Sequence, residues 1–224
     1  MSEDGVILVG VDGSPESLGA VDWAVARAAR DGWRVHILCA YSLPSFTTAS
    51  LDGGYAALDD TAVRSGAQAV VDEAVARAQD KDVTVTGSLE TGDPAGVLVD
   101  LSGEAALAVV GTRGGGGFAD RLLGTVSSAL PAHAYCPTIV VPRHTEGAEY
   151  TPVRRIVVGV DGSESARKAL RWAVREAEAW EAELTAIAAV PMASGAGALA
   201  WLPAAVDREQ VLADVRSGLD RAVA

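Results

Sequence analysis

The sequence reads VILVGVDGS over residues 6–14 and RIVVGVDGS over residues 155–163. At this offset of 149 residues (155 minus 6), 12 positions between residues 7 and 28 are identical in the two copies. A match of this strength indicates an internal repeat, and therefore two units of one fold. Each stretch is a short β-branched run closed by Asp-Gly-Ser, which predicts a buried strand followed at once by a helix.

The first copy continues as strands that alternate with helices. Parallel strands need crossover connections, so this alternation predicts an α/β fold with a five-stranded parallel sheet and helices on both faces. Ligands of such sheets bind beyond the carboxyl ends of the strands. The expected strands are Val6–Val11, Val35–Ala40, Val83–Leu89, Leu107–Gly111 and Thr138–Val141, and the expected helices are Glu16–Arg30, Leu58–Gln79, a short one after Pro94, and Thr125–His133.

The second copy is shorter than the first. We expect a complete domain over residues 1–142, a polar linker over 143–154, and a truncated second domain over 155–224 with helices at 167–183 and 207–224. The 70 residues of the second copy (224 minus 154) leave no counterpart of strands three to five or of the glycine-rich segment described below. A naturally short repeat, a fragment and a shortened reading frame all fit this pattern, and we expect its exposed strand edge to be covered by another chain or by rearrangement.

Composition excludes several classes of protein. The chain has 224 residues, of which 49% are hydrophobic, enough for a conventional core. Its longest apolar run, Ala105–Val110, is far too short to span a bilayer, and it begins Met-Ser-Glu-Asp without the pattern of a secretory signal, so we expect a cytoplasmic location. A formal charge of −12 argues against nucleic acid as a partner. Two cysteines, Cys39 and Cys136, are too few for a disulfide framework.

The segment GTRGGGGFADRLLGTVSS, residues 111–128, leaves one predicted strand and enters the last predicted helix of the first copy. Glycines there allow the backbone to approach a ligand, and the helix start offers N–H groups and a positive dipole end. Hydroxyls at Thr125, Ser127 and Ser128, with the cations Arg113 and Arg121, suit a phosphate group. A flexible connection is the alternative interpretation. Gly-Lys-Ser and Gly-Lys-Thr are absent from the sequence, which excludes a P-loop, and the first strand lacks the dinucleotide fingerprint.

The spacing Gly111-x2-Gly114-x9-Gly124-Thr125, together with Val-Gly-Val-Asp-Gly-Ser, resembles the nucleotide-binding universal stress proteins. The resemblance covers nearly the whole chain and implies the strand order 3-2-1-4-5, with strand five at the edge where two units pair. It implies that Asp12 contacts the nucleoside, that the backbone around Ala40 frames the base, and that the glycine-rich segment binds phosphates. The predicted binding residues are Gly10, Asp12, Ala40, Gly111, Arg113, Gly114, Gly115, Gly116, Gly117, Gly124, Thr125, Val126 and Ser127.

Other candidate residues have simpler interpretations. Asp12 alternatively caps the helix that follows, a role that Ser14 equally fits. His133 suits the helix dipole, and with His36 in a strand and His144 in the linker no metal-ligand spacing emerges, so we predict neither a metal site nor a catalytic residue. The two cysteines are expected on strands two and five as buried apolar residues, too far apart to bridge. The repeated pair Trp23 and Trp172 is expected in the core.

These observations predict a cytoplasmic ATP-binding stress-response regulator, with Mg²⁺ as a candidate companion ion, that acts as a homodimeric switch on an unknown downstream protein. Hydrolysis is expected to be slow or absent, because Asp120 is the one obvious candidate for positioning water. Two alternatives stay open: an ATP-hydrolysing or nucleotidyl-transferring enzyme of the same fold, and a nucleotide-free interaction module.

Overall fold

A computed structural model describes residues 5–42, 60–79, 81–112, 114, 123–143, 150–189 and 208–223. The chain forms two compact units, Met1–Thr151 and Pro152–Ala224. The division falls inside residues 143–154, and each unit is described by itself below. Among the described residues, no helix combines the length and apolar character needed to cross a membrane.

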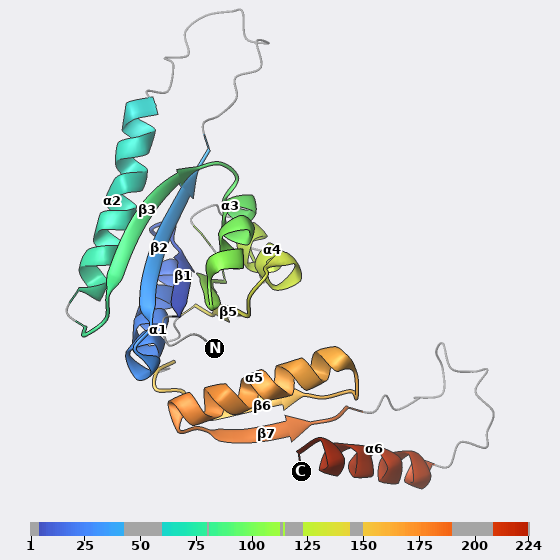
Figure 1. The fold of residues 1–224 in the computed structure, drawn as a ribbon. Helices are drawn as coiled ribbons and strands as arrows, with labels where there is room; N and C mark the ends of the chain where they lie inside the picture. The colour runs from blue at the N-terminus through green and yellow to red at the C-terminus, as the bar shows by residue number, and fades with distance from the viewer. Residues whose placement is uncertain are drawn as a thin grey trace, which may run out of the picture. The chain divides into compact units, whose positions relative to one another are not determined.

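The first unit is a five-stranded parallel sheet in the predicted order β3-β2-β1-β4-β5 (Figure 1). Its connections are crossovers through helices, which the parallel arrangement requires. The elements are β1 (Val6–Gly10), α1 (Pro15–Asp31), β2 (Arg34–Tyr41), α2 (Asp60–Ala78), β3 (Val85–Thr91), α3 (Pro94–Leu101), the 3₁₀ turn η1 (Ser102–Glu104), β4 (Leu107–Gly111), α4 (Thr125–His133) and β5 (Thr138–Val141).

Helices cover both faces of this sheet. Helix α2 lies on one side of it and helices α3 and α4 lie on the other (Figure 1). Alternate residues of each strand supply the two faces, as the pleat dictates. The α3–α4 side holds a cluster of buried apolar residues from five elements, namely three strands and two helices: Leu8, Leu38, Leu98, Ala108, Val110 and Leu130.

Helix α1 begins and ends where its sequence provides caps. The Ser14 hydroxyl accepts a hydrogen bond from the Ser17 N–H, and Pro15 occupies the first helical position, where its missing N–H costs nothing. Gly32 ends the helix in the left-handed conformation at φ 69°. Trp23, expected in the core, is buried on this helix.

The second unit repeats the start of the first. Its elements are β6 (Arg155–Gly159), α5 (Glu164–Trp180), β7 (Glu183–Ile187) and α6 (Arg208–Val223). Strands β6 and β7 pair in parallel, as β1 and β2 do, and Ser163 caps α5 as Ser14 caps α1. Trp172, the repeat counterpart of Trp23, is only half-buried, because fewer described elements pack around α5 than around α1.

Several boundaries differ from the predictions, most of them by one to three residues. Helix α5 begins at Glu164 rather than residue 167, because the Ser163 cap precedes it. Strand β3 begins at Val85 rather than residue 83, because the Val83 N–H bonds to the Lys81 carbonyl in a tight turn. Cys136 precedes β5 instead of lying on it and is only partly buried, whereas Cys39 on β2 is buried as predicted; both cysteines are free thiols. Residues 43–59, which hold most of the predicted loop at 41–54, lie outside the described part of the chain.

The two copies end their first helix differently. Gly32 has φ 69°, and its repeat counterpart Glu181 adopts the same left-handed region at φ 55° with a side chain. A side chain costs about 1 kcal/mol in this conformation. Glu181→Gly should therefore stabilise the second unit by up to about 1 kcal/mol, whereas Gly32→Ala should destabilise the first by about 1 kcal/mol. Urea unfolding of the full chain checks both signs, and a destabilising Glu181→Gly would contradict this account.

His36 joins two strands through both ring nitrogens. Its Nδ1 lies 2.8 Å from Thr86 Oγ1 and its Nε2 lies 2.9 Å from Ser88 Oγ, both on β3. Burial lowers the pKa of His36, and the nearby Glu90 carboxylate opposes part of that shift. The folded chain therefore binds the proton less readily than the unfolded chain does.

We expect the stability of the first unit to be intact above the ordinary histidine pKa and to fall as the pH drops through it, between about pH 8 and pH 5. Urea midpoints measured across this range should flatten in His36→Gln, which keeps polar groups beside both hydroxyls and does not titrate. An equal slope in the variant would assign the pH dependence to other groups.

Candidate functional site: a cleft at the carboxyl ends of β1 and β4

The first unit has a cleft where the strand order reverses between β1 and β4. Connections leave these neighbouring strands in opposite directions, which opens a crevice at their carboxyl ends. The cleft has a volume of about 330 Å³. Its lining residues are Gly10, Val11, Asp12, Ser17, Leu38, Ala40, Pro94, Leu98, Val110, Gly111, Thr112, Gly114, Gly124, Thr125, Val126 and Ser127.

The structure brings together every predicted site residue that it describes. Nine of them line this one cleft: Gly10, Asp12, Ala40, Gly111, Gly114, Gly124, Thr125, Val126 and Ser127. The remaining four, Arg113, Gly115, Gly116 and Gly117, lie outside the described residues. The sheet topology thus brings together residues that lie up to about 117 positions apart in the sequence, as Gly10 and Ser127 do.

Asp12 and Ser14 have different roles in the turn after β1. Asp12 Oδ1 accepts hydrogen bonds from the Ser14 hydroxyl at 2.6 Å and from the Ser14 N–H at 3.0 Å. Ser14 in turn caps α1 through the Ser17 N–H. Ser14 is therefore the helix cap, and Asp12 orients it while lining the cleft.

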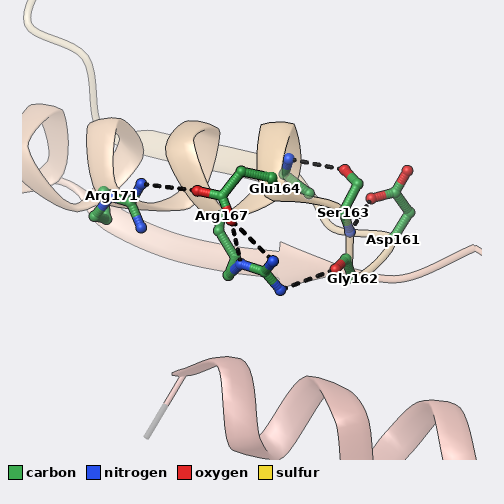
Figure 2. A network of polar contacts seen from close by, with 7 residues as sticks. Asp161, Gly162, Ser163, Glu164, Arg167 and Arg171 are labelled. Carbon is green, nitrogen blue, oxygen red and sulfur yellow. Dashed lines mark hydrogen bonds and ion pairs between the residues drawn. The ribbon is translucent and has the colours of Figure 1, made fainter.

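The second copy builds the same turn. The Ser163 N–H donates to Asp161 Oδ1 at 2.9 Å, and Ser163 Oγ accepts from the Ala166 N–H at 3.0 Å (Figure 2). Glu164, which stands where the first copy has Pro15, pairs with Arg167 at 2.9 Å and with Arg171 at 3.7 Å. The Asp-Gly-Ser turn is thus a local structure that forms in both units, and the neighbours of the first copy distinguish the cleft from it.

Two glycines allow close approaches around the cleft. A Cβ atom on Gly111 would lie 2.7 Å from the Glu16 carbonyl carbon, so the end of β4 touches the first turn of α1. A Cβ atom on Gly114 would overlap Asp12 Oδ2. Gly114 therefore lies against the Asp12 carboxylate, and any side chain at residue 114 displaces one of the two.

Ser127 fastens the start of α4 to the end of β4. Its side chain is only 2% exposed, and Oγ accepts from the Gly124 N–H at 2.9 Å while donating to the Thr112 carbonyl at 2.8 Å. The hydroxyl predicted to bind phosphate is therefore engaged with backbone groups and holds the segment in shape. Gly124 at the N-cap has no side chain to accept from α4, which leaves capacity at the helix N-terminus for an anion.

The charges at the cleft are sparse. Asp12 is the one charged side chain among the described lining residues. The buried thiol of Cys39 lies nearby on β2, and its burial, reinforced by the Asp12 charge, raises its pKa. No group of three His, Cys, Asp or Glu side chains within the described ranges is arranged to hold a metal ion.

Sequence reasoning missed the wall of the cleft that α3 supplies. Pro94 and Leu98 both line it, and Asp93 caps that helix by accepting from the Gly96 N–H at 2.9 Å. The available signal was Asp93-Pro94 directly after a strand, which places a helix start at the same sheet edge as the glycine-rich segment. Thr112, whose carbonyl accepts from Ser127, was also missed.

The fold and cleft define a doubly wound α/β protein with a ligand crevice at its switch point. The universal stress protein family matches residues 5–142 and again residues 152–221. This chain belongs to that family, and it contains two matches to it in tandem.

Similar proteins agree with this assignment. A universal stress protein of Mycobacterium tuberculosis strain H37Rv is 31% identical over 226 residues, which cover 95% of this chain and 73% of that protein. A universal stress protein structure from Burkholderia pseudomallei is 28% identical, covers 63% of this chain and 98% of its own, and has a TM-score of 0.51. One from Archaeoglobus fulgidus covers 94% of this chain and 72% of its own at 19% identity and a TM-score of 0.65, which shows the shared fold.

Substitutions of the neighbouring residues Ser127 and Ser128 test which hydroxyl holds the start of α4 to the end of β4. Ser127→Ala removes the buried hydroxyl that links Thr112 and Gly124, and should cost about 1–2 kcal/mol of stability. Ser128→Ala removes an exposed hydroxyl bonded only to the Gly124 carbonyl at 2.8 Å, and should cost less than about 0.5 kcal/mol. Urea unfolding measures both, and equal costs would show that Ser127 does not fasten the segment.

Proposed function

We propose that the first unit binds an adenine nucleotide, with ATP as the ligand and Mg²⁺ as its candidate companion, in the cleft between β1 and β4. The observation that carries the proposal is the convergence of nine predicted binding residues on one crevice at the topological switch point. The α4 N-terminus suits the phosphates, and Asp12 suits the nucleoside hydroxyls. The backbone at Ala40 suits an edge of the base.

The nucleotide acts as a switch in this proposal. A ligand shifts a conformational equilibrium by its difference in affinity for the two states, and slow turnover keeps the shift in place. The close contact between Gly114 and Asp12 supports this mechanism, because a nucleoside that engages Asp12 also meets Gly114, the neighbour of that carboxylate. We place the protein in the cytoplasm as a stress-response regulator, a homodimer acting on a downstream protein.

Calorimetric titration of Mg·ATP into the full chain tests the proposal. The wild type should bind saturably. Gly114→Asp puts a second carboxylate into the cleft beside Asp12 and should weaken binding of the anionic nucleotide by roughly 100-fold or more. The control is Gly66→Ala on α2, where an added Cβ meets no neighbour within 4 Å, and this variant should bind as the wild type does.

The other outcomes of this titration are informative. A folded wild type that binds no adenine nucleotide would overturn the proposal and favour a nucleotide-free interaction module. Steady release of inorganic phosphate that disappears in Asp12→Asn would favour an enzyme instead of a switch. Circular dichroism of each variant ensures that lost binding does not reflect a lost fold.

A further inference from the structure

The first unit holds the chain where it leaves the sheet. Arg143 follows β5 closely, and its Nε lies 3.6 Å from Oε1 of Glu16 in the first turn of α1. The Tyr150 hydroxyl donates a hydrogen bond to the Arg143 carbonyl at 2.8 Å. All three residues belong to the first unit, and we call them the exit cluster. Both the side chain and the carbonyl of Arg143 are therefore engaged.

The exit cluster is attached to the body of the unit through Glu16. The side chain of Glu16 is only 11% exposed, so its carboxylate has little water around it and depends on neighbouring groups for stabilisation. A guanidinium beside such a carboxylate contributes more than one in a fully exposed ion pair. Glu16 and Tyr150 also line one cavity, together with Val141 and Pro142 of the chain leading to Arg143.

Two contacts join this cluster to the end of β4, which lines the cleft. The Thr112 N–H donates to the Val141 carbonyl at 2.9 Å, shortly before Arg143 in the sequence. A Cβ atom on Gly111 would lie 2.7 Å from the carbonyl carbon of Glu16 and 2.9 Å from its Cβ. Gly111 and Thr112 both belong to the cleft lining. The end of β4 therefore contacts the cleft and both supports of the exit cluster.

The end of β4 also holds the start of α4. The Thr112 carbonyl accepts from the Gly124 N–H at 2.9 Å and from the Ser127 hydroxyl at 2.8 Å. Thr112 is thus bonded to the α4 N-terminus through its carbonyl and to β5 through its N–H. A displacement of the α4 N-terminus reaches the exit cluster through this residue.

We propose that the end of β4 couples occupancy of the cleft to the exit cluster, so that a bound nucleotide tightens the hold on Arg143. A ligand that contacts Thr112 and the α4 N-terminus favours the arrangement in which both are in place, and that arrangement also positions Val141 and Glu16. For its ligand this proposal rests on the proposed function. It names the output of that switch, which is the attachment of the segment after β5.

Tryptic cleavage after Arg143 in the full chain measures this attachment. Trypsin must bind the arginine side chain and attack its carbonyl, the two groups that the exit cluster engages. Mass spectrometry of the fragments gives the initial rate at each site, and cleavage after Arg27, which is 2% exposed, reports unfolding of the unit. Relative to that site and without nucleotide, Glu16→Gln and Tyr150→Phe should each speed cleavage after Arg143 roughly fivefold.

Variants outside the exit cluster test the coupling without any nucleotide. Ser127→Ala loosens Thr112 from α4 and should speed cleavage after Arg143 roughly threefold. Ser128→Ala leaves the Thr112 carbonyl unchanged and should have no effect. The matched control for Glu16→Gln is Asp22→Asn, which breaks another ion pair of α1, the one with Arg77 at 2.7 Å, and should also have no effect.

Mg·ATP completes the test. At saturation it should slow cleavage after Arg143 roughly fivefold in the wild type, and because coupling is reciprocal, Glu16→Gln should weaken Mg·ATP binding whereas Asp22→Asn should not. Nucleotide that binds without slowing cleavage, or wild-type cleavage in Ser127→Ala or Glu16→Gln, would overturn the coupling. A chain that binds no nucleotide but is cleaved faster in Ser127→Ala would refute the proposed ligand and retain the coupling.

Discussion

The pairing of β1 with β4 is the contact on which the first unit depends. These strands are far apart in the sequence, and their parallel register runs from Ile7 beside Leu107 to Gly10 beside Val110. Strands β2 and β3 follow on one side of β1, whereas β4 and β5 lie on the other. This reversal of strand order creates the crevice at the carboxyl ends of β1 and β4. Gly111 makes the fit possible, because the end of β4 lies against the backbone of Glu16 and leaves no room for a Cβ atom.

A single local motif has different consequences in the two units. Asp-Gly-Ser forms the same capped turn after β1 and after β6, with Gly13 at φ 80° and Gly162 at φ 82°. Its geometry follows from short-range hydrogen bonds, and it forms beside the two-stranded sheet as it does beside the five-stranded one. A binding crevice needs more, namely the glycine-rich segment after β4 and the wall from α3. The repeated turn at residues 161–163 therefore does not by itself indicate a second site.

Much of the fold follows from periodicity and capping residues. The strand order came from the family resemblance, and the bounds of α4 and β4 from Pro, Gly and hydroxyl positions. Tertiary contacts explain what was missed. Arg27 lies in the second half of α1, where a cation suits the helix dipole, yet it is 2% exposed, paired with Asp31 at 2.7 Å and stacked 5.1 Å from the Trp33 ring. A charge pattern alone does not reveal that a guanidinium is buried between such partners.

The candidate site, like the fold, was only partly predictable from the sequence. Glycine and hydroxyl spacing located the segment around α4, but it did not distinguish a hydroxyl that faces a ligand from one that fastens the backbone. The Ser127 hydroxyl fastens the backbone, since it accepts from Gly124 and donates to Thr112, while the residue also lines the cleft. Only the folded arrangement decides between these roles, because both require a small hydroxyl residue in the first turn of a helix.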